Sequence, residues 1–146
     1  MLRVAVLLGA VTVGGLTACS PAAVDEPSLL DRQGDLSDLG PVVLSSEGGA
    51  PSTLEITPAS FASVAGLTEP VHAAKLIVAV TCLDSDAVTV SLNGEELGEV
   101  SCGDDSGTGY IAVTTAGPVD LGQPVTVVAD GARGTLVAVS VVIQLP

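Results

Sequence analysis

Residues 87–102 read AVTVSLNGEELGEVSC, and this stretch decides the fold class. Val88, Val90 and Leu92 alternate with polar residues, which is typical of a strand with one buried face. The pair Asn93 and Gly94 follows directly, and this pair is preferred in the two-residue type I′ turn of a β-hairpin. The stretch therefore predicts two antiparallel strands joined by a tight turn.

The second strand of this hairpin has the wrong parity for a regular ladder. With a two-residue turn, Val90 faces Leu97, and Val100 then points to solvent. One extra residue would turn Val100 and Cys102 inward together with Leu97, and Gly98 is a suitable place for it. We therefore expect a β-bulge at Gly98.

The rest of the body repeats short β-branched runs between turn residues. The run AKLIVAVTC at 74–82 is almost continuously apolar, which predicts a strand in the centre of a sheet. Further strands are expected at STLEIT (52–57), YIAVTT (110–115), PVTVVA (124–129) and TLVAVSVVIQL (135–145). Even spacing of short strands predicts an all-β domain at 51–146, a single antiparallel β-sandwich of jelly-roll or immunoglobulin-like topology.

The N-terminal 20 residues, MLRVAVLLGAVTVGGLTACS, have the three parts of a signal peptide. Arg3 gives a positive start, an apolar run follows that is too short for a membrane span, and small residues precede Cys19. The ending Leu16-Thr17-Ala18-Cys19 resembles the lipobox of bacterial prolipoproteins. The resemblance implies cleavage after Ala18, so that residues 1–18 are a lipoprotein signal peptide and Cys19 carries a diacylglycerol and becomes the new N-terminus. The alternatives are a plain signal peptide or an uncleaved anchor.

Residues 19–50 lack sustained periodicity and are rich in Pro, Ser, Gly, Asp and Glu. This composition predicts a flexible, disordered, acidic linker that follows the lipidated N-terminus. Within it, SLLDRQGDLSDL at 28–39 could form a helical turn, and PVVL at 41–44 could add an edge strand to the sandwich.

The chain has three cysteines, and lipidation of Cys19 would leave Cys82 and Cys102. The resemblance to prolipoproteins implies export to an oxidising compartment, where disulfides persist, so these two cysteines are expected to pair. The alternative, a metal site, would need a Cys-x-x-Cys pair or nearby histidines, and His72 is the only histidine.

Four aspartates follow the two paired cysteines closely. If the disulfide forms, these carboxylates gather at one end of the sandwich, where Ca²⁺ would relieve their repulsion. The alternative is that they are solvated turn residues. The candidate Ca²⁺ ligands are Asp84, Asp86, Asp104 and Asp105.

Other charged and aromatic residues give weaker indications. Glu95, Glu96 and Glu99 flank the hairpin turn, where solvated charges keep a sheet edge from pairing with another chain. Phe61 and Tyr110 are the only aromatic residues, and they are either core residues or a small sugar-stacking pair.

Composition excludes some functions. The net charge of −13 is unsuited to nucleic acid, and no nucleophile constellation or phosphate loop is present, so we expect no nucleic-acid partner and no enzymatic activity. The hairpin, the turn Gly-Gln-Pro at 122–124 and the Val-rich strand after it resemble the second half of galactose-binding-like jelly rolls, which are found in carbohydrate-binding modules.

The expected function is that of a non-enzymatic surface lipoprotein. The chain would be anchored by lipid at the extracytoplasmic face of the cell membrane, with a binding or envelope-structural role and an unidentified protein or glycan partner. The alternatives are a carbohydrate- or Ca²⁺-binding module, with no cofactor other than that cation, and an accessory subunit of an envelope complex.

Overall fold

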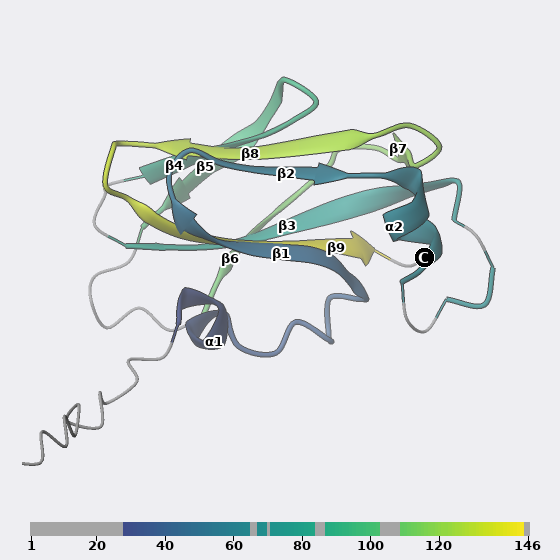
Figure 1. Ribbon diagram of the computed structural model, residues 1–146, viewed down its shortest axis with the longest axis horizontal. Helices are drawn as coiled ribbons and strands as arrows, with labels where there is room; N and C mark the ends of the chain where they lie inside the picture. Colours follow the sequence, from purple (N-terminus) through teal and green to yellow (C-terminus); the bar gives the residue numbers. More distant parts are fainter. Residues whose placement is uncertain (1–27, 65–66, 70, 84–86, 103–108, 145–146) are drawn as a thin grey trace, which may run out of the picture.

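The computed structural model describes residues 28–64, 67–69, 71–83, 87–102 and 109–144. Two antiparallel sheets pack face to face, as Figure 1 shows, so the predicted all-β sandwich is confirmed. The elements are α1 (Leu29–Gln33), β1 (Val42–Gly49), β2 (Ser52–Ile56), α2 (Pro58–Ala62), β3 (Ala73–Leu83), β4 (Ala87–Leu92), β5 (Glu95–Ser101), β6 (Ile111–Thr114), β7 (Val119–Asp120), β8 (Val125–Gly131) and β9 (Leu136–Gln144).

The strand order is that of a jelly roll. One sheet has the order β1-β9-β3-β6, with β7 also paired to β3, and the other has the order β2-β8-β4-β5. The chain changes sheets at almost every connection, and β4 and β5 form a hairpin within one sheet. Immunoglobulin domains have a different strand order, so of the two expected topologies the jelly roll is the one observed.

The core between the sheets consists of aliphatic side chains from both inner faces, with Phe61 of α2 as the aromatic member. The alternating burial of β2, β4 and β8 follows the period-two pattern of their sequences. β3 is buried on both faces from Leu76 to Leu83, as its continuous apolar run predicted, and it lies between β9 and β6.

The hairpin turn has the predicted type I′ character. Asn93 has φ 51° and Gly94 has φ 84°, which are the two positive values that this turn requires. Asn93 also fixes the turn to β8, because its backbone N–H donates to Thr126 O at 2.8 Å and its Oδ1 accepts from Thr126 N at 2.9 Å.

The bulge expected in β5 is present, but one residue before the expected position, Gly98. Val90 pairs with Gly98 whereas the next residue, Ser91, pairs with Glu96, so the extra residue is Leu97. Val100 is consequently turned into the core and is 1% exposed.

Residues 28–41, which we call the N-terminal strap, do not form the flexible linker that the sequence predicted. The strap crosses the outer face of the β1-β9-β3-β6 sheet, and α1 lies against β3 and β9 (Figure 1). Leu29 packs on Leu83 and Ala138, and Leu36 packs on Ile77 among others. The domain therefore begins near Ser28 and not at residue 51, and residues 19–27 lie outside the described part of the chain.

The physical reason for this docking is the outer face of β3. A strand with apolar residues on both faces must be covered on both sides. The opposite sheet, β2-β8-β4-β5, covers only the inner face of β3. Gln33 satisfies backbone groups there: it is 3% exposed, and its Nε2 donates to Ala79 O at 3.0 Å while its Oε1 accepts from the Ser140 hydroxyl. Among the described residues, no buried side-chain nitrogen or oxygen of the strap is left without a hydrogen-bond partner.

Local hydrogen bonds shape the strap before it reaches the sheet. Ser28 and Asp31 form a capping box at the start of α1, and the Glu47 carboxylate of β1 accepts from the N–H groups of Leu29 at 3.1 Å and Leu30 at 3.3 Å. Further along, the Ser37 N–H donates to the Asp35 carboxylate at 2.8 Å and lowers the pKa of Asp35. The bond contributes its full stability to the strap at pH values above the ordinary pKa of an aspartate. That contribution is lost as the pH falls through the lowered pKa of Asp35.

Candidate functional site

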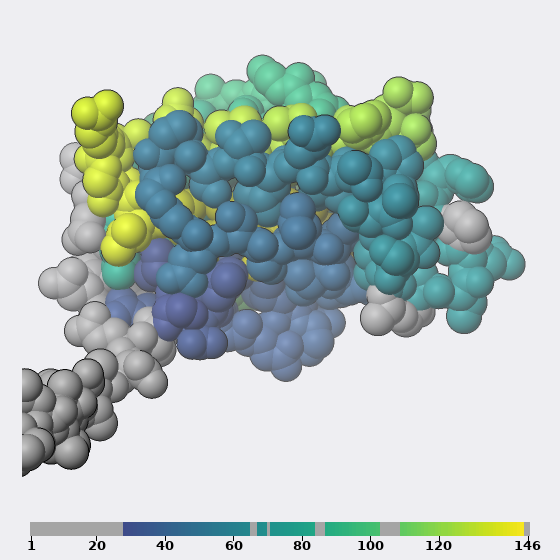
Figure 2. Space-filling view, in the orientation of Figure 1, coloured from purple at the N-terminus to yellow at the C-terminus, as the bar shows by residue number. Residues whose placement is uncertain are grey.

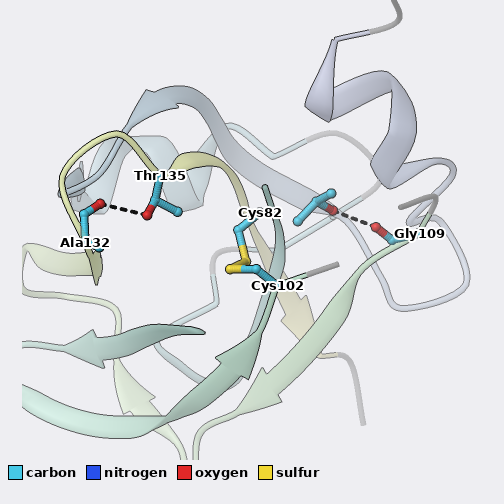
Figure 3. Close-up of a disulfide and its surroundings, with 6 residues drawn as sticks. Cys82, Cys102, Gly109, Ala132 and Thr135 are labelled. Atoms are coloured by element: carbon cyan, nitrogen blue, oxygen red, sulfur yellow. Dashed lines mark hydrogen bonds between the residues drawn. A yellow bond between two sulfur atoms is a disulfide. The ribbon is translucent and has the colours of Figure 1, made fainter. Parts of the chain in front are cut away.

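A disulfide joins the two sheets at one end of the sandwich. Figure 3 shows the bond between Cys82, near the end of β3, and Cys102, just after β5. The S–S distance is 2.08 Å and the Cα–Cα distance is 4.9 Å. The pairing expected from the cysteine count is thus present. β3 and β5 belong to different sheets, so the bond fastens the sheets to each other.

Hydrogen bonds on both sides of the disulfide hold the connecting segments in place (Figure 3). The Thr81 hydroxyl donates to Gly109 O at 2.7 Å, and Gly109 N donates to Arg32 O at 2.6 Å. On the other side, the Thr135 hydroxyl donates to Ala132 O at 2.7 Å within the β8–β9 turn. The strap, β3 and the start of β6 therefore meet at this end, which we call the disulfide end.

The sequence-predicted Ca²⁺ ligands Asp84, Asp86, Asp104 and Asp105 lie outside the described residues, and so does the predicted lipidation site, Cys19. Within the described ranges, no three His, Cys, Asp or Glu side chains are grouped so that they could hold a metal ion. The Ca²⁺ site therefore stays a prediction from the sequence.

A groove of about 280 Å³ opens at the opposite end of the sandwich. The β4–β5 hairpin forms one wall and the segment that joins β6 to β7 forms the other, and in Figure 2 the hairpin stands out at the upper edge of the molecule. The lining residues are Leu92, Glu95, Glu96, Leu97, Thr114, Thr115, Ala116, Gly117, Pro118 and Val119.

The groove combines apolar and polar lining residues with negative charge. Glu95 and Glu96 are both exposed, and the lining contains no Lys, Arg or His. Thr115 is buried, and its hydroxyl accepts from Leu76 N at 3.0 Å, which fixes the wall formed by the β6–β7 segment to β3.

Two edge strands border the groove. Among the described strands, β5 pairs with β4 alone and β6 pairs with β3 alone, so each has one edge without a strand partner. Gly98 of β5 approaches Val113 of β6 so closely that a Cβ atom at Gly98 would lie 3.3 Å from Val113 Cγ1. The seam between the sheets is thus closed at Gly98 and opens at the hairpin end.

From the sequence, Glu95 and Glu96 were expected to be solvated charges at a sheet edge, and both are exposed. The groove beside them was not predicted from the sequence. The two aromatic residues do not form a sugar-stacking pair. Phe61 is 1% exposed and lies in the core between the sheets, whereas Tyr110 packs with Leu36 and Ile77 on the outer face of the β1-β9-β3-β6 sheet.

Neither α1 nor α2, the two helices in the described part of the chain, has the length and apolar content that a membrane-spanning helix needs. Comparison of the chain with models of protein families, with curated proteins and with solved structures finds no match.

Proposed function

We propose that this protein is a non-enzymatic lipoprotein, anchored by Cys19 at the extracytoplasmic face of the cell membrane, which holds a small binding module close to that membrane. The sequence support is the lipobox-like ending at Leu16–Cys19. The structural support is that Cys82 and Cys102 lie at disulfide distance, which suits an oxidising compartment and leaves Cys19 as the remaining thiol.

The observation that carries this proposal furthest is the position of Ser28. Eight residues separate Cys19 from Ser28, and a fully extended chain of that length spans at most about 30 Å. Leu29 packs near Leu83 and Ala138, which places the entry of the chain at the disulfide end. An acylated Cys19 would therefore keep the disulfide end toward the membrane and present the groove away from it.

The charge of the chain is consistent with attachment by lipid. A net charge of −13 disfavours adsorption to anionic headgroups, so attachment would depend on buried acyl chains. Each buried CH₂ group contributes about 0.8 kcal/mol, and two chains suffice for stable anchoring.

Expression of the full chain in a bacterial host, followed by fractionation and intact-mass measurement, tests the anchor. The expected mature protein begins at Cys19, carries the mass of a diacylglycerol and sediments with membranes, whereas Cys19→Ser abolishes the modification. The double variant Cys82→Ser with Cys102→Ser is the control, since it keeps Cys19 and should remain membrane-bound. An unmodified mature N-terminus upstream of residue 19 would overturn the proposal.

The orientation has its own test in membranes that contain photoactivatable phospholipid. The exposed Arg133 lies in the β8–β9 turn at the disulfide end, and the exposed Gln123 precedes β8 at the groove end. Crosslinked lipid is detected as added mass on the peptide that contains each position. The peptide with Arg133 should carry more crosslinked lipid than the peptide with Gln123. A Gly/Ser insertion of about 20 residues after Ser20 should remove the difference. Equal crosslinking with the native tether would contradict the proposed orientation.

A further inference from the structure

We propose that the groove binds a Lys or Arg side chain of an extended polypeptide segment that aligns with the free sheet edge at the β4–β5 hairpin. This inference goes beyond the proposed function, because it concerns the groove itself and holds whether or not Cys19 is lipidated. It commits to a cationic polypeptide, and a glycan or a divalent cation is an alternative that the structure disfavours.

The size of the groove limits what it can hold. Its volume of about 280 Å³ lies below the range typical of sites for drug-sized ligands. A space of this size suits one long side chain. No aromatic residue lines it, so it lacks the platform on which sugar rings stack.

The lining matches both parts of a cationic side chain. Leu92, Leu97 and Pro118 offer apolar surface for the methylene stem of Lys or Arg, whose charged head stays toward water. At the rim, the carboxylate of Glu95 or of Glu96 supplies the complementary charge. The absence of any cation from the lining leaves these carboxylates available for a cation from outside.

A divalent cation fits this arrangement less well. Glu95 and Glu96 are consecutive residues of one strand, and consecutive side chains project to opposite faces. Their carboxylates therefore do not converge on one ion in the way that Ca²⁺ coordination requires. A cationic side chain needs only one of them.

The sheet edges explain why the ligand should be an extended segment. β5 and β6 each present an edge without a strand partner in the described part of the chain, and such an edge offers N–H and C=O groups to an added strand. The close approach of Gly98 to Val113 blocks the seam beyond the groove. The segment can therefore engage only the hairpin end, which makes the contact short and the side chain in the groove its main determinant.

The test uses the full chain with Cys19→Ser, so that failure of the anchor does not affect it. The probe is a capped octapeptide of alternating Lys and Thr, and the matched control peptide carries acetyl-lysine in place of each Lys. Amide chemical-shift mapping should place the lysine peptide at residues 95–97 and 114–119. The control peptide with acetyl-lysine should not bind, because it lacks the positive charges.

Charge-matched variants separate the groove from general attraction to an acidic protein. Glu95→Gln with Glu96→Gln should weaken binding of the lysine peptide about three- to tenfold. Asp38→Asn with Asp130→Asn removes the same charge from exposed positions outside the groove, and it should weaken binding less than twofold. Equal weakening by the two double variants would overturn the proposal, as would shifts spread over the whole surface.

A steric variant provides a readout that leaves the charge unchanged. Ala116→Trp places a large side chain at an exposed position of the groove lining, in the segment that joins β6 to β7. Binding should be lost while the circular dichroism spectrum and melting temperature stay close to those of the parent. A folded Ala116→Trp variant that binds the lysine peptide as well as the parent does would show that the groove is not the site.

Discussion

At the scale of single residues, Asn93 shows how one side chain can satisfy two requirements of a turn. It tolerates the positive φ of 51° better than most non-glycine residues do, and its Oδ1 accepts from Thr126 N at 2.9 Å. The first property suits the hairpin turn, and the second ties that turn to β8. Because Glu95 follows two residues later, directly after the turn, Asn93 also fixes where the groove begins.

Replacement of Asn93 should therefore destabilise the domain. Asn93→Ala loses the hydrogen bond and strains the positive φ, so the free energy of unfolding should fall by about 1–3 kcal/mol in urea titrations. Asn93→Gly is the matched control, because glycine loses the same hydrogen bond without the strain, and its effect should be smaller. If both variants lose the same stability, backbone strain is not the cause.

Gly98 illustrates how a residue with no side chain permits contact between sheets. A Cβ atom there would approach Val113 Cγ1 to 3.3 Å, so any larger residue requires the Val113 side chain to shift by a few tenths of an ångström. Gly98→Val should crowd this contact and lower stability by about 1–3 kcal/mol, measured by urea titration. Ser101→Val, at an exposed position of the same strand, should leave the stability nearly unchanged.

At the scale of elements, the strap shows where the sequence was informative and where its interpretation failed. The alternation of β4, the Asn93–Gly94 turn and the parity of Val100 were enough to predict the hairpin and its bulge, because both depend on residues close in sequence. The strap was misassigned because composition outweighed a local signal. Ser28 and Asp31 have the spacing of a capping box, and Leu29 and Leu36 are spaced two helical turns apart.

The continuous apolar run of β3 also indicated that the strap would dock. It predicted a central strand correctly, yet it also required a cover for the outward-facing Ile77 and Ala79, and the strap supplies one. The groove gave no comparable signal, since its two walls are distant in sequence and meet only when both sheets have formed.

Disruption of Gln33 should release the strap while the sandwich stays folded. Gln33→Ala removes a side chain that is 3% exposed and leaves Ala79 O and the Ser140 hydroxyl without these partners, so stability should fall by about 2 kcal/mol. Hydrogen exchange should accelerate in residues 28–41 and on the outer face of β3. The exposed Gln123→Ala variant is the control, and comparable exchange in both variants would contradict this account.

At the scale of the whole molecule, the Cys82–Cys102 bond connects two sheets that otherwise adhere through their apolar faces. It closes a loop with a sequence separation of 20 residues, for which the chain-entropy description gives about 3 kcal/mol. The double variant Cys82→Ser with Cys102→Ser should lose that amount of stability in urea titrations. The parent protein under reducing conditions should show a comparable loss, and full stability after verified reduction would mean that the core alone holds the sheets together.

The docking of the strap also determines how the domain would respond to mechanical load. A pull applied to Ser28 from the N-terminal side loads the short helix and its few contacts before any strand. Peeling of residues 28–41 would release about 45 Å of chain before tension reached β1. The strap would thus act as an extensible coupling, which lengthens the connection under tension and shields the sandwich and its groove from being unfolded.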